Sequence, residues 1–379
     1  MIPRTLFSQE HEDFRKSFRR FLEDEIIPHH ERWEEQQCVD RAIWNRAGEL
    51  GFLCVTMPEE YGGAGADRLY SVTMMEEQAI TGVSGLGFSV HSDIVANYIN
   101  NFGNADQKMQ WLPRMASGEL VGAIAMTEPG TGSDLKAIKA TASSEGDHYL
   151  LNGSKTFITN GFLSDLVIVV AKTGSSGEGA KDISLLLVEA KTLGFTKGKP
   201  LKKIGMKAQD TCELFFDNVR VPKANLLGKE GGGFVALMQE LAWERVILAI
   251  TSIAGAEAAL LHTLEYTRGR KVFGNAVATY QSTRFKLAEM KAELVIGRVF
   301  VDRCLEQVLV KKLGVDDAAI AKYWCSDLQG KIVDQCLQLH GGNGYMLEYP
   351  IARHYIDCRA QRIYGGTNEI MKELIARTM

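Results

Sequence analysis

Sequence typical of β-strands is confined to one central stretch of the chain, roughly residues 121 to 226. Val, Ile, Thr and Phe are dense there, and the turns between apolar runs are short. The segments before and after it carry helical patterns, whereas a parallel α/β sheet would alternate strands with helices. We therefore predict an α+β fold with an N-terminal helical domain (1–122), a middle β domain (123–230) and a C-terminal helical domain (231–379).

Local signals add detail to the helical domains. Ser8 is the predicted N-cap of a first helix that runs to Ile27, where Pro28 should interrupt it. The C-terminal domain should be a four-helix bundle, since long helical segments occupy 234–268, 281–310, 316–339 and 351–363. No G-x-G-x-x-G sequence separates a strand from a helix, so a dinucleotide site of the Rossmann type is not expected.

The middle domain is expected to be antiparallel and barrel-like or sandwich-like. The dipeptide Asn152-Gly153, between two strand-like triplets, predicts a hairpin. Near-continuous apolar runs at 166–171 and 183–188 predict buried strands. The stretch 174–179 should be a solvated loop within this domain.

Composition argues against several classes of protein. A net charge of −4, without a basic cluster, is atypical of a nucleic-acid surface. The seven cysteines are scattered and lack metal-ligand spacing, so no metal site is expected. We find neither a targeting segment nor the run of about 18 apolar residues that a membrane span needs. A cytoplasmic protein is expected, or one of the mitochondrial matrix if a transit peptide has been removed.

The sequence AMTEPGTGSD, residues 125–134, is a candidate ligand-binding turn. Its glycines let the backbone approach a ligand closely. Its free N–H groups, together with Thr and Ser hydroxyls, suit a phosphate-bearing or oxygen-rich ligand. An ordinary Pro-Gly turn between two elements would produce the same pattern.

Glu244 is the candidate catalytic residue. On a helix that advances about 100° per residue, it falls at the centre of a stripe formed by Leu237, Leu241 and Leu248. A carboxylate in such a stripe is costly unless it is paired or functional. The alternative is an internal pair with Arg245 or another basic neighbour.

Five sequence segments, in order, resemble motifs of the acyl-CoA dehydrogenase family of flavoproteins, and the resemblance spans nearly the whole chain. The segments are AMTEPGTGSD (125–134), TFITNG (156–161), RKVFG (270–274), QLHGGNGYMLEYP (338–350) and IYGGTNEI (363–370). The last two are most similar to the long-chain branch, with isovaleryl-CoA dehydrogenase a near neighbour.

The resemblance implies FAD, bound non-covalently between the β domain and the C-terminal helices. Met126 and Thr127 would lie along the polar edge of the flavin, and Ser133 near the pyrophosphate and the substrate. Phe157, where the family usually has Trp, and Thr159 would flank the ring. The other implied FAD residues, the first six partly from a neighbouring subunit, are Arg270, Phe273, Gln281, Gln338, Gly341, Gly342, Thr367 and Glu369.

Some of these residues also have plain structural interpretations. Arg270 could belong to a solvated helix end, and Gln281 could simply begin a helix. Gly341-Gly342 could be a helix C-cap followed by a turn.

The resemblance also concerns the catalytic residues. Most members carry their base as Glu in a Tyr-Glu-Gly-Thr sequence, which here reads Tyr-Gly-Gly-Thr, residues 364–367. The long-chain and isovaleryl enzymes carry it instead on the helix of Glu244, in a Glu-Arg context. The backbone N–H of Gly365 would donate to the thioester carbonyl. The implied substrate-binding residues are Ser133, Arg245, Tyr364 and Gly366.

The implied function is FAD-dependent dehydrogenation of an acyl-CoA thioester, of medium or long chain, to the trans-2-enoyl-CoA. A carboxylate would abstract the α-proton, and the β-hydrogen would pass to flavin N5 as hydride. Electron-transfer flavoprotein would accept the electrons from a homotetramer. Alternatives are an acyl-CoA oxidase, a non-catalytic partner subunit, and branched short-chain or steroid side-chain thioesters as substrates.

Overall fold

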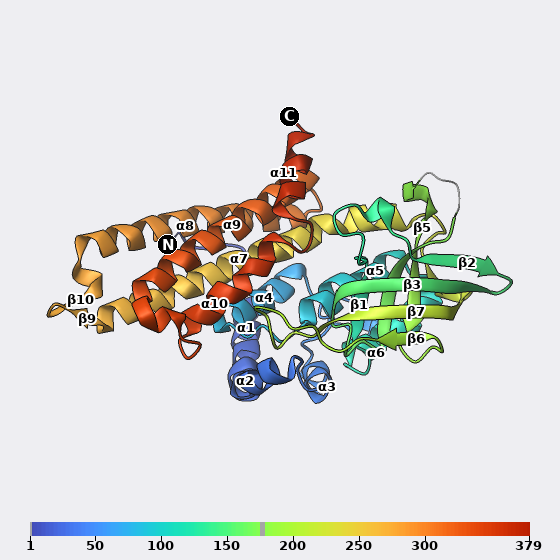
Figure 1. Cartoon of the computed structure of the whole chain (residues 1–379), viewed down its shortest axis with the longest axis horizontal. Coiled ribbons are helices and arrows are strands. Elements are labelled where there is room, and N and C mark those ends of the chain that lie inside the picture. Colours follow the sequence, from blue (N-terminus) through green and yellow to red (C-terminus); the bar gives the residue numbers. More distant parts are fainter. Residues whose placement is uncertain (1, 175–178) are drawn as a thin grey trace.

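The computed structural model describes residues 2–174 and 179–379 and has three parts in the order of the sequence (Figure 1). The long C-terminal helices reach one end of the elongated molecule and the β domain lies at the other. The predicted α+β class is confirmed. The loop expected over 174–179 falls mainly on residues 175–178, outside the described part of the chain.

The N-terminal part begins with a helical rod that passes through Pro28. Ser8 is the N-cap of α1, as predicted, but the predicted interruption at Pro28 is wrong. Pro28 lies in the first turn of α2, directly after the wide turn η1, where its missing N–H costs little. The elements are α1 (Gln9–Phe21), η1 (Leu22–Ile26), α2 (Ile27–Gln36), α3 (Ala42–Glu49), η2 (Glu59–Tyr61), α4 (Arg68–Thr81), η3 (Val90–Val95), α5 (Ala96–Phe102) and α6 (Ala105–Ala116).

Within the described residues, the middle part is one sheet of eight strands in the order β6-β7-β3-β2-β4-β5-β8, with β1 paired to β4. Most neighbours are antiparallel, while β1 and β4 are parallel. The elements are β1 (Gly122–Ala125), η4 (Leu135–Ala137), β2 (Thr141–Glu145), β3 (His148–Thr159), β4 (Leu166–Lys172), η5 (Gly179–Asp182), β5 (Ile183–Glu189), β6 (Phe195–Lys197), β7 (Thr211–Pro222), η6 (Lys223–Asn225) and β8 (Leu226–Leu227).

The hairpin predicted at Asn152-Gly153 is wrong. β3 runs straight through this dipeptide, and its register with β7 shifts between Leu151 and Gly153, as at a β-bulge. Glycine is needed here because φ is 139° and an added Cβ would lie 2.8 Å from Ala140. The actual turn lies between β2 and β3, at Gly146 (φ 57°). Glycine in a strand-like run marks bulges and close backbone approaches as well as turns.

The buried strands predicted at 166–171 and 183–188 are confirmed as β4 and β5. Side chains of β4 alternate between two cores. Leu166 and Ile168 pack with residues of α5, α6 and the start of α7, whereas Val167 and Val169 pack with residues of β3 and β7. Both faces of β4 are therefore apolar, which explains why its sequence shows no polar alternation.

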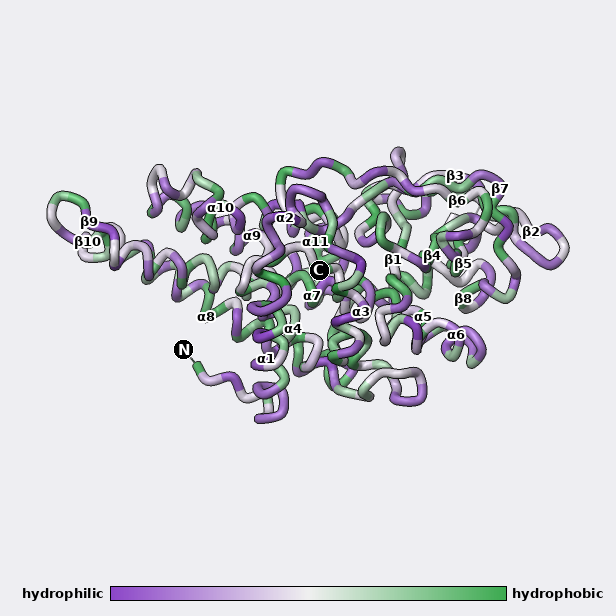
Figure 2. Tube along the Cα trace, turned by 90° about the horizontal axis from the view of Figure 1, so that it is seen from below, coloured by the Kyte–Doolittle hydropathy of each residue, from purple (hydrophilic) through white to green (hydrophobic). Residues whose placement is uncertain are grey.

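The C-terminal part is built on long helices, of which α7 packs mainly against α9 and also against α4 and α8. Seen from below, the β9–β10 hairpin projects at the end of these helices opposite the sheet (Figure 2). The elements are α7 (Gly233–Gly269), β9 (Lys271–Val272), β10 (Asn275–Ala276), η7 (Val277–Thr279), α8 (Gln281–Leu309), α9 (Val315–His340), η8 (Gly341–Tyr345), α10 (Pro350–Asp357), η9 (Cys358–Arg362) and α11 (Asn368–Ala376).

By length and composition alone, α7 is apolar enough to cross a membrane, which differs from the expectation that the chain holds no such segment. In the structure, 78% of its most apolar window is buried inside the protein, as happens in the core helix of a soluble domain. α7 starts beside the sheet, where Gly233 abuts Ser184, and ends at the β9–β10 hairpin. It therefore links the middle domain to the far end of the bundle.

Candidate active site

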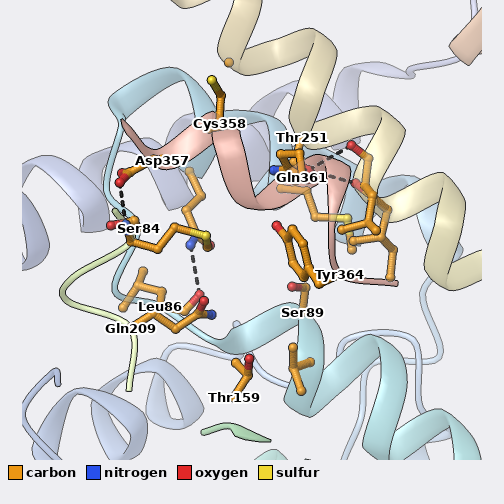
Figure 3. A pocket seen from close by; sticks show the side chains of 18 of the residues that line it. Ser84, Leu86, Ser89, Thr159, Gln209, Thr251, Asp357, Cys358, Gln361 and Tyr364 are labelled. Atoms are coloured by element: carbon orange, nitrogen blue, oxygen red, sulfur yellow. Dashed lines mark hydrogen bonds between the residues drawn. The ribbon is translucent and has the colours of Figure 1, made fainter. Parts of the chain in front are cut away.

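A pocket lies where α7 passes between α4, η3 and the segment that runs from α10 to Gly365 (Figure 3). It contains about 1190 Å³ of space free of protein atoms, part of it open to solvent. Four predicted site residues line it, namely Thr159, Glu244, Tyr364 and Gly365. Thr159 comes from the β domain and the other three from the C-terminal part, so the pocket lies where these two parts meet the N-terminal helices.

Glu244 is buried, with 8% of its surface exposed, and among the described residues one side chain donates a hydrogen bond to it. The hydroxyl of Tyr98, on α5, donates to Glu244 Oε1 over 3.0 Å. Burial, together with the negative charge of Glu240, raises the pKa of Glu244 to about 7, although the Tyr98 hydrogen bond and the charge of Arg245 oppose the shift. A carboxyl with such a pKa can take up and release a proton near neutral pH.

Arg245 does not pair with Glu244 in the described part of the chain. Consecutive residues on a helix point about 100° apart, so the two side chains diverge. Arg245 is itself buried, its Nε has no hydrogen-bond partner, and burial lowers its pKa. The proposed internal pair is therefore not the reason for a carboxyl in the apolar stripe.

The absence of a side chain at Gly365 leaves space for Leu248 of α7. It has φ +65°, and an added Cβ would lie 2.4 Å from Cδ1 of Leu248, one turn beyond Glu244. The segment is fixed next to it, because the buried Lys322 donates to the carbonyl of Gly366 over 2.7 Å and to Asn368. A side chain at 365 and the present position of Leu248 are incompatible.

The AMTEPGTGSD segment forms the predicted turn after β1, and a buried ion pair supports it. Lys155 Nζ lies 2.9 Å from Glu128 and also donates to the carbonyl of Met126. The Glu128 carboxylate accepts the N–H groups of residues 139 and 140. These contacts therefore hold the turn on its buried side. Ser133 is exposed and Thr127 is half-buried.

Phe157 is an exposed aromatic ring beside this turn. Its side chain is 68% exposed and its backbone has φ 59°, which is uncommon for a bulky residue. Two residues further along β3, Thr159 reaches the pocket wall. A large ring held out of the core next to hydroxyl groups suits the flat face and polar edge of a flavin. Phe157, Thr159, Met126 and Thr127 are the residues that could hold that ring.

The remaining predicted cofactor residues fall into two other places. Thr367 caps α11 by accepting the N–H of Ile370 over 3.3 Å, and Glu369 follows it on the surface, close to the pocket in sequence and in space. The second group lies at the far end of the bundle, around the β9–β10 hairpin and the end of α9 (Figure 1), and consists of Arg270, Phe273, Gln281, Gln338, Gly341 and Gly342.

This far group does not meet the pocket within one chain. Tyr266, near the end of α7, donates a hydrogen bond to the carbonyl of His340, at the end of α9. This bond joins the two helix ends that carry the far group. Phe273 is 96% exposed. Gly341 ends α9 with φ 59°, and nothing lies within 4 Å of a Cβ added there or at Gly342. Gln281 begins α8 and Gly341 ends α9, as their plain structural interpretations predicted. Gly341 and Gly342 leave an open surface there.

Sequence reasoning missed Tyr98, Lys155 and Lys322. Tyr98 is 146 residues from Glu244 in the chain, and nothing in its local pattern distinguishes it from a core tyrosine. Lys155 lies in the polar stretch Asn-Gly-Ser-Lys-Thr of β3, where a lysine usually faces solvent, so no local signal indicates that it is buried.

A buried carboxyl whose pKa is raised to about 7 on the wall of a pocket is an arrangement typical of active sites. Comparison with known proteins shows to which family the chain belongs. The N-terminal, middle and C-terminal domain models of acyl-CoA dehydrogenase match residues 8–119, 123–219 and 231–379. The chain belongs to the acyl-CoA dehydrogenase family and is an oxidoreductase of that type.

Individual relatives agree over nearly the full length. The mitochondrial long-chain specific acyl-CoA dehydrogenase of Rattus norvegicus is 52% identical over 375 residues, which cover 99% of this chain and 87% of the relative. A crystal structure of acyl-CoA dehydrogenase from Geobacillus kaustophilus is 46% identical, with TM-score 0.98 and 99% of both chains covered. The Bacillus anthracis acyl-CoA dehydrogenase complexed with FAD is 33% identical, with TM-score 0.91, covering 98% of this chain and 67% of that one.

Proposed function

We propose that the protein dehydrogenates the Cα–Cβ bond of medium- or long-chain acyl-CoA thioesters with FAD as cofactor, giving the trans-2-enoyl-CoA. The observation that carries this proposal is Glu244, a buried carboxyl with a pKa of about 7 on the wall of a pocket. An α-proton next to a thioester is weakly acidic, and a desolvated carboxylate is a base matched to that task.

The residues around the pocket supply the remaining functions. The backbone N–H of Gly365 is the proposed donor to the thioester carbonyl, where negative charge develops as the proton leaves. Tyr364 and Gly366 flank that position, and Arg245 and Ser133 serve the CoA side. FAD, when bound, supplies the acceptor of the β-hydrogen as hydride. Met126, Thr127, Phe157 and Thr159 hold the flavin from the β domain, with Ser133 near the pyrophosphate.

We propose a homotetramer in which the far group of cofactor residues serves a neighbouring subunit. Arg270, Phe273, Gln281, Gln338, Gly341 and Gly342 lie together but away from the pocket of their own chain. We assign them to the adenine-diphosphate half of FAD bound to a neighbouring subunit, with Thr367 and Glu369 closing over the cofactor. The open space above Gly341 and Gly342 supports this assignment, because a ligand can approach the backbone there.

The length of the pocket supports a medium or long acyl chain. Glu244, Leu248, Thr251 and Gly255 line it in succession along one face of α7. Eleven residues of helix advance about 16 Å, roughly the length of an extended chain of a dozen carbon atoms. The 52% identical relative from Rattus norvegicus is named as long-chain specific, which points the same way.

Electron-transfer flavoprotein is the proposed electron acceptor, and the cytoplasm or the mitochondrial matrix the proposed location. The relatives include a mitochondrial protein from Rattus norvegicus and an acyl-CoA dehydrogenase from Bacillus subtilis. Dye-linked turnover with negligible peroxide would exclude the alternative of an oxidase. The alternative of a non-catalytic subunit is disfavoured by a carboxyl tuned to near-neutral pKa in the pocket.

The variant Glu244→Gln tests the base. It should keep FAD and bind acyl-CoA, yet lose flavin reduction by roughly 10²- to 10⁴-fold, as expected when a positioned base is removed. The measurement is anaerobic bleaching of the flavin by dodecanoyl-CoA in a stopped-flow instrument. Glu265→Gln, exposed on the same helix, is the matched control and should bleach normally. Normal bleaching by Glu244→Gln would show that another group is the base.

A further inference from the structure

The part of the pocket beyond Glu244 is lined by polar side chains that each have one polar atom without a hydrogen-bond partner. Gln329 on α9, Gln361 in η9 and His354 on α10 all line the pocket, and each is more than nine-tenths buried. Gln329 Oε1, Gln361 Oε1 and His354 Nε2 make no hydrogen bond. Buried polar atoms are nearly always paired, so three orphans around one cavity indicate a missing polar partner inside it.

These groups lie along α7 at a defined distance from the reacting centre. Gln361 Nε2 contacts the hydroxyl of Thr251 at 3.4 Å, and Gln329 Nε2 lies 2.6 Å from a Cβ built on Gly255. Thr251 and Gly255 follow Glu244 by two and three turns of helix, or about 10 and 16 Å along the axis. An acyl chain that extends from Glu244 along this face would pass the orphans with its distal half.

The charge around the orphans excludes an ionised partner. Among the described residues that line the pocket there is neither Lys nor Arg, whereas Glu244 and Asp357 are acidic. Burial lowers the pKa of His354 to about 3, so its ring is neutral at physiological pH, and burial raises the pKa of Asp357 to about 6. A carboxylate would meet no cation there, and a cation would find the Asp357 carboxylate already accepting the N–H of Met206.

A saturated hydrocarbon tail is also a poor match. It would offer no hydrogen bond to either amide oxygen and leave both buried and unpaired, which opposes binding. A hydroxyl is small and neutral, can donate to either glutamine oxygen, and can accept from an amide N–H in return.

We propose that the pocket selects acyl-CoA thioesters whose chain carries a neutral hydroxyl group on its distal half, held by Gln329 and Gln361. The inference rests on the proposed function and names the substrate class of the same site. The hydroxyl is a recognition group only. It takes no part in the dehydrogenation, which proceeds at Cα and Cβ as in an unsubstituted chain.

The test compares tetradecanoyl-CoA with its hydroxylated derivatives, the hydroxyl placed at successive carbons, and with the thioester of the matching α,ω-dicarboxylic acid. Second-order rates of anaerobic flavin bleaching by the holoenzyme give the preference. We expect hydroxyl groups on the distal half to raise this rate roughly ten-fold over tetradecanoyl-CoA, the effect of one well-formed hydrogen bond. Hydroxyl groups near the thioester should give no gain, and the dicarboxylic thioester should be the poorest substrate.

The variants Gln329→Leu and Gln361→Leu test the residues. Each should remove most of the preference for the hydroxylated chain, measured as the ratio of the two rates within one variant. Gln9→Leu, on the exposed face of α1, is the matched control and should keep the wild-type ratio. Because both rates are measured on the same variant, a loss of folded protein cancels in their ratio. The series of hydroxyl positions is measured on the wild type, so it does not depend on the folding of any variant.

Three results would overturn the inference while leaving the proposed function intact. They are equal rates with and without the hydroxyl, a preference for the dicarboxylic chain, or an unchanged ratio in both leucine variants. Absence of bleaching by every thioester, tetradecanoyl-CoA included, would instead refute the proposed function.

Discussion

Replacing Tyr98 by Phe should shift the pH dependence of the reaction without removing the base. The phenol is the one hydrogen-bond donor to Glu244 in the described part of the chain, and it stabilises the charged carboxylate. A hydrogen bond to a charged group contributes about 1.5–3 kcal/mol, and one pKa unit corresponds to about 1.4 kcal/mol. The pKa of Glu244 should therefore rise from about 7 by roughly one to two units.

The sign of the effect on rate follows from the role of the base. Glu244 is competent only when deprotonated, so kcat/KM falls as pH drops through its pKa in the free enzyme. In Tyr98→Phe the midpoint of this fall should lie roughly one to two pH units higher than in the wild type. At pH 7 the loss should be roughly 5- to 50-fold, and most of it should disappear near pH 9.

The assay is anaerobic flavin bleaching by dodecanoyl-CoA, followed from pH 5.5 to 9.5. Tyr149→Phe is the matched control, because it removes another tyrosine-to-glutamate hydrogen bond, 2.8 Å long, between Tyr149 and Glu230 in the β domain. Its pH profile should equal that of the wild type. A Tyr98→Phe profile with an unmoved midpoint, or a loss of equal size at every pH, would refute the argument that this hydroxyl tunes the carboxyl.

Two further predictions concern stability. Gly365→Ala should lower the melting temperature measured by differential scanning calorimetry, because the new Cβ would lie 2.4 Å from Leu248 at a φ of +65°. The double variant Gly365→Ala with Leu248→Ala should lose less stability than the sum of the two single variants. Strictly additive losses would contradict the clash. The free energy of unfolding should fall as pH drops from about 6.5 towards 4, because buried His91 has a pKa lowered to about 4 by burial and accepts the N–H of Gly122 while donating to the carbonyl of Met115. The loss from this histidine should be on the order of 3 kcal/mol at the acid end and should vanish in His91→Gln; identical urea-unfolding curves against pH for both proteins would show that His91 is not responsible.

The order of domains and the position of Glu244 could be predicted because both follow from periodicity. Strand-like composition was concentrated in one stretch, and a single carboxyl interrupted an apolar helix face. Both are properties of neighbouring residues in sequence, and the fold preserved them.

What could not be predicted depends on contacts between distant segments. Glycine is required at the bulge at Gly153 because Ala140 of the preceding segment leaves no room for a Cβ, which no local pattern reveals. The donor to Glu244 comes from α5, and the polar lining of the pocket comes from α9, α10 and η9. Pro28 was misjudged for a different reason, because a proline that breaks a helix interior is tolerated in the first turn of a new one.

The contact between Leu248 and Gly365 has a consequence for how such a protein could change by single substitutions. The space that a carboxylate side chain at 365 would need is filled by Leu248, whose Cδ1 lies 2.4 Å from the built Cβ. A glutamate arriving at 365 would be strained by the φ of +65° and would have to push aside the end of the Leu248 side chain, and shortening Leu248 alone would leave a cavity. Neither step is favourable by itself, so the two positions are tied by epistasis. Packing between Leu248 and Gly365, as well as the chemistry of the site, therefore favours keeping the acidic residue on α7.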